Sequence, residues 1–250
     1  MIEASILTNI FVYLVLTILT FVNIIIPISG SAVVTPFLAL LADPHRAIAL
    51  ASFYFMLGGM IRVLIFRKEI QFNHVKALLP ISLITAAIGA LSLLPINPEI
   101  LLWIIFLFTA YFLYKAIKQH FKSEKISSVN RLTVAAVGLL SGFLQGTGLS
   151  GSDLRNNYLY SQKLSLVQVH GTTALIGAAN FLTATIIRLL TSQTTVADLT
   201  PLIYVLPFMV FATWLGRHTL YRIDRKYADW IIILVMAAIT FFLILKILKI

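Results

Sequence analysis

The sequence predicts an all-α polytopic membrane protein of two inverted repeats, each with four spanning helices and one short, re-entrant half-helix. Three observations support this prediction. Hydrophobic residues make up 60% of the 250 residues and charged residues only 11%, whereas soluble domains carry about 25% charged residues. Short polar turns interrupt the apolar sequence at two places. The two halves of the chain also align with each other, and the basic residues of their loops alternate between two sides.

The first apolar run is too long to be one spanning helix. No charged residue occurs between Glu3 and Asp43, and as one helix of about 1.5 Å per residue this run would be nearly 60 Å long, about twice a bilayer core. Pro27 and Gly30 mark where the chain turns. We therefore expect a helix over about 5–26 and a short helix over about 31–41, which would cross roughly half a membrane.

The other elements follow from similar apolar runs. The first repeat (1–119) continues with predicted helices over about 46–66, 75–94 and 99–119. A basic linker (120–131) leads to the second repeat (132–250), with predicted helices over about 132–148, 152–162 (the second short helix), 166–190, 199–219 and 227–248. The sequence does not decide whether the short helices are re-entrant or parts of broken spans.

The loops differ in charge. Lysine and arginine gather in 67–76, 115–131 and 217–226, and are absent from 94–99 and 190–198. The positive-inside rule makes the first three loops cytoplasmic, the other two external and both termini external. We expect a prokaryotic plasma (inner) membrane. The net charge of +10 lies mainly at helix ends and in loops, which favours contact with anionic lipid head groups rather than nucleic acid.

The two halves share a pattern of special residues. Ser29-Gly30-Ser31 aligns with Ser150-Gly151-Ser152, and the alignment continues to Arg67 and Arg188. Because Arg67 borders a cytoplasmic loop and Arg188 an external one, the halves are expected to run in opposite directions. Inverted repeats with interrupted helices are typical of secondary transporters, which bind substrate near the midplane. After a short insertion the matching pairs are Pro80 with Pro207, Gly89 with Gly216, and Trp103 with Trp230.

The interrupted elements predict an anion site. Non-helical backbone at membrane depth must be buried in protein or face water, so each Ser-Gly-Ser turn is expected to line a cavity. Serine is a good N-cap, and two helix N-termini that face each other would attract an anion. Arg155 would bind such an anion bidentately. The predicted substrate-binding residues are Ser29, Gly30, Ser31, Ser52, Ser150, Gly151, Ser152, Arg155, Asn156, Thr172 and Thr173.

Asp153 and His170 are the predicted proton-coupling residues. Each of the two residues has alternative roles. Asp153 could instead cap its helix, hold Arg155 in place, or extend with Arg155 to the membrane interface. His170 could instead make a structural hydrogen bond. Arg62 is expected to snorkel, and Asn180 to bond between helices. The chain has no cysteine, and the sequence indicates no cofactor and no metal site.

These residues carry a family resemblance. Over nearly its whole length the chain resembles the sulfite exporter TauE/SafE family, also known as DUF81 membrane transporters. The run from Ser29-Gly30-Ser31 to Pro36 loosely matches the family's glycine-rich turn and proline, and His170-Gly171-Thr172-Thr173 matches its Gly-Thr-Ser helix entry. Ala51-Ser52 keeps only the serine of that entry. The chain also departs from the family where apolar residues and proline are usual, at Asp153, Arg155, Asn156 and Asn157.

The resemblance implies transport of sulfite, a sulfonate or a related small sulfur-containing or organic anion. With the repeat, it predicts a secondary transporter that works by alternating access, with protons as a candidate coupling ion, and not an enzyme. One alternative is an anion channel. Another is a rhomboid-like hydrolase, since Gly148-Leu149-Ser150-Gly151 offers Ser150 as nucleophile and His170 as base. A homodimer is one candidate for the oligomeric state. The sequence does not determine that state, the substrate, the coupling ion or the direction of transport.

Overall fold

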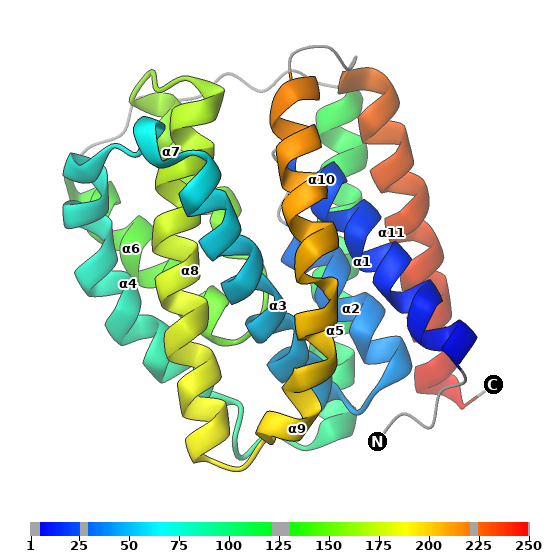
Figure 1. Cartoon of the computed structure of the whole chain (residues 1–250). Helices are drawn as coiled ribbons and strands as arrows, with labels where there is room; N and C mark the ends of the chain where they lie inside the picture. The colour runs from blue at the N-terminus through cyan, green and yellow to red at the C-terminus, as the bar shows by residue number, and fades with distance from the viewer. Residues whose placement is uncertain (1–5, 26–29, 122–130, 221–224, 250) are drawn as a thin grey trace.

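The computed structural model describes residues 6–25, 30–121, 131–220 and 225–249, and in this part of the chain every regular element is a helix (Figure 1). The elements are α1 (Ile6–Ile25), α2 (Ser31–Leu41), α3 (Pro44–Ile65), η1 (Arg67–Glu69), α4 (Phe72–Ser92), α5 (Pro98–Phe121), α6 (Arg131–Gly146), α7 (Ser152–Ser161), α8 (Leu166–Leu190), α9 (Val196–Leu199), η2 (Thr200–Val205), α10 (Leu206–Thr219) and α11 (Arg225–Leu248).

The predicted all-helical architecture is confirmed, with one local exception. The expected helices over 31–41 and 166–190 coincide with α2 and α8. The expected single helix over 199–219 is instead divided into the end of α9, the 3₁₀ helix η2 and α10. Pro201 and Pro207 lie in the first turns of η2 and α10. Because proline lacks a backbone N–H, each of them interrupts the helical hydrogen bonds that one continuous helix would need.

Five described stretches are long and apolar enough to cross a membrane: α3, α4, the Pro98–Lys118 part of α5, α8, and the Val196–Thr219 stretch that contains α9, η2 and α10. Apolar segments of α1, α6 and α11 are shorter than this criterion requires. Large apolar side chains such as Leu64, Ile84 and Leu234 point outward and are more than 60% exposed. An outer surface of this kind suits a helix bundle surrounded by lipid.

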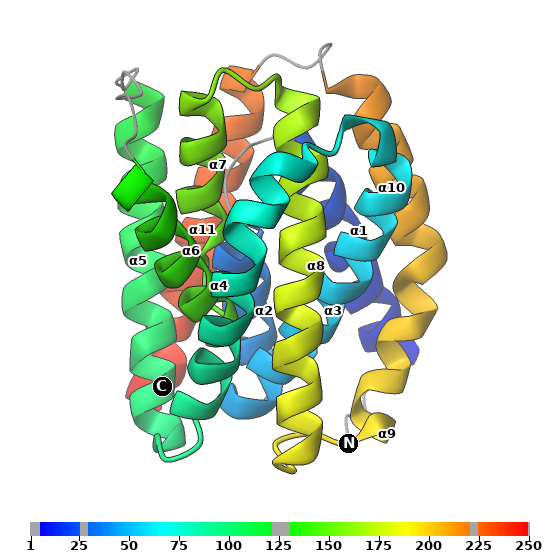
Figure 2. The same ribbon diagram turned by 90° about the vertical axis from the view of Figure 1, so that its left-hand side faces the viewer.

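The two halves of the chain interleave. Helices α3 and α8 lie side by side and run in opposite directions (Figures 1 and 2). Helix α4 of the first half packs on α6 of the second, and α10 of the second half packs on α1 of the first. The segments 1–119 and 132–250 therefore do not pack as two separate bodies.

Small residues permit the closest of these contacts. A side chain at Gly142 would overlap the backbone of Ser82, and one at Gly146 would overlap the backbone of Ala86. Close approach through small residues is a common way for helices to associate in a membrane, where water does not drive their contact. We call this contact between α4 and α6 the small-residue seam.

The two short helices occupy opposite halves of the bundle. In Figure 2, α7 lies in the upper half and α2 in the lower half. Helix α2 ends close to α11, where Lys246 Nζ donates to the carbonyls of Ala39 at 2.6 Å and Ala42 at 3.1 Å. Thr35 Oγ1 of α2 also donates to the carbonyl of Gly148, 2.8 Å away, in the turn that precedes α7. The two interrupted elements are thus in direct contact.

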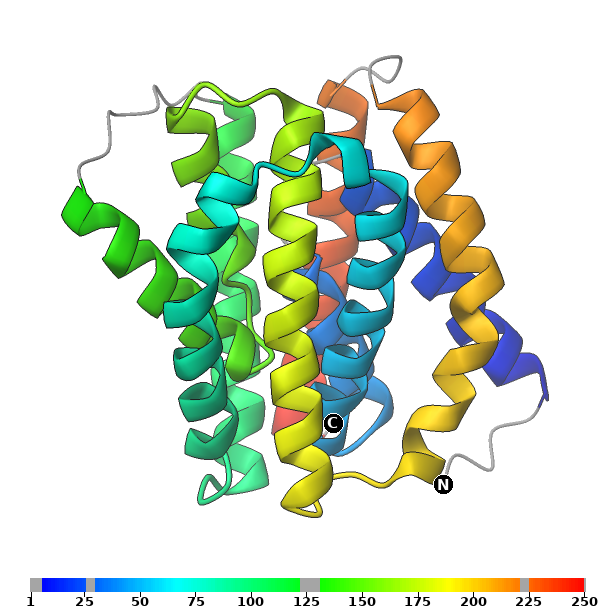
Figure 3. The ribbon, with the colours of Figure 1, turned by 60° about the vertical axis from the view of Figure 1, so that its left-hand side comes forward.

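The helix ends and their connections separate into two sides of the bundle. The α3–α4 connection, the end of α10 and the start of α11 lie at the upper end of the bundle in Figure 3. The α4–α5 and α8–α9 connections, the start of α1 and the end of α11 lie at the lower end. The connection at 67–76 and the helix ends that flank 217–226 therefore lie on the opposite side of the bundle from the connections at 94–99 and 190–198.

Candidate functional site

Both short helices begin at one small cavity, which we call the central cavity. Its volume is about 40 Å³, against roughly 10–15 Å³ for a cavity that holds one water. Gly30 and Ser31 line it from the start of α2, and Ser152 from the start of α7. The other lining residues are Asn23, Phe55, Gly59, Arg62, Gln145, Arg155, Thr173, Ala174, Gly177, Ala178 and Phe181.

Glycine, not serine, caps each short helix. The N-cap residues are Gly30 and Gly151, and neither helix start has a side-chain capping hydrogen bond. The expectation of serine caps is therefore wrong for the described turn residues; Ser29 lies outside the described part of the chain. The reason is close packing, since a side chain at Gly30 would overlap the amide of Asn23 and one at Gly151 would overlap the carbonyl of Ser141.

Arg155 places a guanidinium at the central cavity. Its side chain is fully buried, and Nη1 donates to Gln145 Oε1 at 2.6 Å. Within the described part of the chain, neither Nε nor Nη2 has a hydrogen-bond partner. Burial excludes the alternative in which Arg155 snorkels to the interface. The cavity wall therefore includes a cation with unused donors.

A chain of hydrogen bonds fixes the arginine. Asn180 Nδ2 on α8 donates to Gln145 Oε1 at 2.8 Å, and Ser82 Oγ on α4 donates to Asn180 Oδ1 at 3.1 Å. The expectation that Asn180 bonds between helices is confirmed. Sequence reasoning missed Gln145, although a glutamine inside the apolar run of α6 was a signal, because polar side chains at membrane depth are costly and often functional.

Two donors converge beside Gly177. The point where a methyl group at Gly177 would lie is 3.5 Å from Arg155 Nη2 and 3.6 Å from Gln145 Nε2. Gly177 itself lines the cavity. Guanidinium and amide N–H groups donate only, so this space suits the oxygens of an anion.

Arg62 brings a second guanidinium to the cavity wall. Its side chain turns back along α3, where Nε donates to the Gly58 carbonyl at 3.3 Å. The expectation that Arg62 snorkels to the interface is therefore wrong. Position near the end of a helix indicated snorkelling, but the side chain is long enough to reach inward instead.

Thr173 is the one residue of the His170–Thr173 entry that lines the cavity, and its hydroxyl donates to Asn156 Oδ1 at 2.9 Å. Asn156 does not line the cavity, and this hydrogen bond connects it to a residue that does. Thr172 is fully buried away from the cavity wall. Its hydroxyl accepts a hydrogen bond from the Gln71 N–H at 3.0 Å, which connects α8 to the start of α4.

Three other predicted residues lie away from the cavity wall. Ser52 is fully buried; its hydroxyl donates to the Ile48 carbonyl and accepts from Arg188. Ser150 is buried, and its hydroxyl has no hydrogen-bond partner in the structure. Gly151 packs against Ser141.

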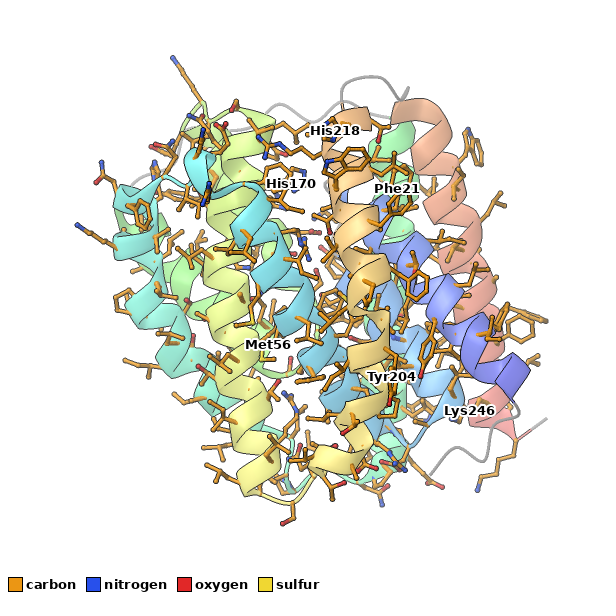
Figure 4. All side chains as sticks on the ribbon, viewed as in Figure 1. Phe21, Met56, His170, Tyr204, His218 and Lys246 are labelled. Carbon is orange, nitrogen blue, oxygen red and sulfur yellow. The ribbon has the colours of Figure 1, made fainter. Side chains whose placement is uncertain are left out.

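The two predicted proton-coupling residues are separate from each other. Asp153 Oδ2 pairs with Lys115 Nζ of α5 at 3.2 Å, next in sequence to the cavity residue Ser152. His170 stacks on Phe66 with ring centroids 5.9 Å apart, near the end of the bundle that holds His218 (Figure 4). Since no described residue hydrogen-bonds Ser150 Oγ, Ser150 and His170 do not form a nucleophile–base pair in this structure.

Comparisons with known proteins agree with the membrane architecture. The family model described as sulfite exporter TauE/SafE matches residues 12–243. No curated protein and no solved structure matches the chain.

Proposed function

Because the chain belongs to the sulfite exporter TauE/SafE family, we propose that it is a secondary transporter for sulfite, a sulfonate or a related small anion. This family consists of membrane exporters of sulfur-containing anions, so the chain is an integral membrane protein of a transporter family. The specific anion, its coupling and the transport mechanism are proposals.

The observation that carries the proposal is Arg155. A fully buried guanidinium with two nitrogens that donate to no described residue is costly in a membrane protein unless a negative charge compensates it. The N-termini of α2 and α7, which line the same cavity, add positive partial charge from the helix dipoles. A compact oxyanion would satisfy all of these groups.

We assign the anion to the space beside Gly177. Arg155 Nη2 and Gln145 Nε2 would donate to its oxygens, with Arg62 as a further cation on the wall. Ser31, Ser152 and Thr173 would contact it from three helices. Ser52, Ser150, Gly151, Asn156 and Thr172 would support this site without touching the anion.

The two antiparallel halves would provide alternating access. We propose that 1–119 and 132–250 are inverted repeats joined by a cytoplasmic linker over 120–131, and that their relative movement exposes the cavity to each side in turn. The basic loops would face the cytoplasm and both termini the outside of a plasma (inner) membrane.

Coupling to protons would use Asp153 rather than His170. Asp153 pairs with Lys115 immediately beside the cavity residue Ser152, so protonation of this carboxylate would break an ion pair at the start of α7. With Asp153→Asn, we expect sulfite transport to continue but to lose its response to an imposed pH gradient. An unchanged response would reject this role.

The alternatives are less well supported. A serine hydrolase would need a base that hydrogen-bonds the Ser150 hydroxyl, and no side chain of the described ranges does so. An anion channel would use the same cavity, and saturation of flux at low turnover would separate a carrier from a channel.

Uptake of radiolabelled sulfite into proteoliposomes tests the proposal directly. Loss of one partner of a buried charged interaction costs about 2–5 kcal/mol, so Arg155→Gln should lower transport by at least about tenfold. Arg46→Gln is the matched control, because Arg46 pairs with Asp198 away from the central cavity. Wild-type activity in Arg155→Gln would contradict the site, and absence of sulfite, sulfate and sulfonate transport by the wild type would contradict the function.

A further inference from the structure

Arg188 is a second buried arginine that the proposed site does not use. The sequence places it near the end of α8 beside an external loop, yet its side chain is fully buried. Its Nη1 donates to Ser52 Oγ at 2.9 Å and its Nη2 to the Gly146 carbonyl at 2.5 Å. The sequence analysis assigned Arg188 no role in the predicted anion site.

The charge of Arg188 is not neutralised by the groups that hold it. Its hydrogen-bond partners are a hydroxyl and a backbone carbonyl, and no ion pair with a described carboxylate involves it. Its Nε has no hydrogen-bond partner among the residues that the structure describes. Buried arginine is normally paired with an acidic group, and these two hydrogen bonds supply none.

Arg188 is connected to the central cavity through one turn of α6. Gln145, which accepts from Arg155, and Gly146, which accepts from Arg188, are consecutive residues. They lie at the C-terminal end of α6, where the helix dipole stabilises cations. This turn therefore holds two fully buried guanidiniums, of which only Arg155 lines the cavity.

We propose that Arg188 is a second anion-binding residue, which receives the oxyanion from Arg155 when the protein opens toward the side of the α8–α9 connection. This inference rests on the proposed anion transport. The ligand is a compact oxyanion with at least two free oxygens, because a planar guanidinium binds such groups with two parallel hydrogen bonds. In the present conformation Ser52 and Gly146 occupy its donors, and the anion would replace them.

The proposal separates binding from transport. Arg188→Gln leaves the central cavity intact, so sulfite should still stabilise the protein in a thermal-shift titration with an apparent Kd within about threefold of the wild type. Exchange of radiolabelled sulfite across proteoliposomes should fall by about tenfold or more. Arg188→Lys, which keeps the charge but not the bidentate geometry, should recover part of the rate, whereas Arg155→Gln should lose binding and transport together.

A second experiment uses the wild-type protein and does not depend on folding of a variant. Phenylglyoxal modifies arginine, and mass spectrometry of peptides reports each site. In the absence of sulfite we expect phenylglyoxal to modify Arg188, and saturating sulfite should slow this modification. A site that loads with anion must be reachable from water, so either absence of modification or modification that sulfite does not change would overturn the second site.

The two proposals can fail separately. If Arg155→Gln abolishes sulfite exchange while Arg188→Gln exchanges at the wild-type rate, the second site is wrong and the transporter stands. If the wild type neither binds nor exchanges sulfite, sulfate or sulfonates, the proposed function itself is wrong.

Discussion

Gly177 leaves open the space beside Arg155 that we propose for the anion. A methyl group there would lie 3.5 Å from Arg155 Nη2 and 3.6 Å from Gln145 Nε2, which is ordinary van der Waals contact. The substitution Gly177→Ala should therefore be tolerated by the fold but occupy the space where the two donors converge.

We expect Gly177→Ala to weaken sulfite binding by about tenfold or more, since each lost charged hydrogen bond is worth about 1.5–3 kcal/mol. The melting temperature without ligand should stay near the wild type. Gly138→Ala is the matched control. Gly138 lies on α6 and does not line the central cavity, and its added methyl group would meet Ile81 of α4 at a similar distance of 3.5 Å. Equal sulfite affinity in the two variants would contradict the assigned position of the anion.

At this scale the sequence identified some residues of the cavity and missed others. Arg155, Ser152 and Thr173 were found because polar residues stand out in an apolar chain. Gln145 and Arg62 were missed, since helical spacing shows which residues share a face but not which distant helix that face meets. For the same reason Ser52 and Thr172 were included, although their hydroxyls serve other contacts.

Among the helices, α2 depends on a cation supplied from the other end of the chain. Lys246 of α11 donates to the carbonyls of Ala39, Leu40 and Ala42, which are groups that a helix C-terminus leaves without intrahelical partners. The opposite end of α2 lines the central cavity. A contact at one end of this short helix thus positions the other.

Lys246→Met should lower the stability of the protein by about 1–2 kcal/mol, because it removes charged hydrogen bonds and a favourable dipole interaction. For a protein of this size we expect a loss of roughly 2–8 °C in melting temperature. Lys249→Met is the control: Lys249 pairs with Glu99 through side chains that are 82% and 76% exposed, and its removal should have little effect. Similar losses in both variants would contradict the capping role.

Helix existence and length were the most predictable features of the chain. Apolar runs fix both in a membrane, where a helix satisfies its own backbone hydrogen bonds. The break at Pro201 and Pro207 was not predicted, because a proline within a transmembrane run either kinks the helix or begins a new one, and tertiary contacts decide which.

For the whole molecule, orientation is the property that can be tested most simply. The natural sequence has no cysteine, so an introduced one is a unique label. Asn73 at the start of α4 and Asn97 before α5 are both exposed. The α3–α4 and α4–α5 connections that flank them lie at opposite ends of the bundle.

A membrane-impermeant maleimide applied to intact cells should label the Asn97→Cys variant. The Asn73→Cys variant should react only after permeabilisation, because the positive-inside rule places the basic 67–76 loop in the cytoplasm. The reverse pattern would invert the orientation, and labelling of both sites in intact cells would reject a single orientation.

The small-residue seam has a consequence for biosynthesis. Helix α4 leaves the ribosome before α6 exists, so its face around Ser82 and Ala86 enters the bilayer without the partner that later packs there. Likewise α1 must wait for α10, which is made near the end of translation. Assembly therefore cannot proceed half by half: a nascent chain that stops after α5 leaves both of these helix faces unfilled, and they close only after α6 and α10 have been made.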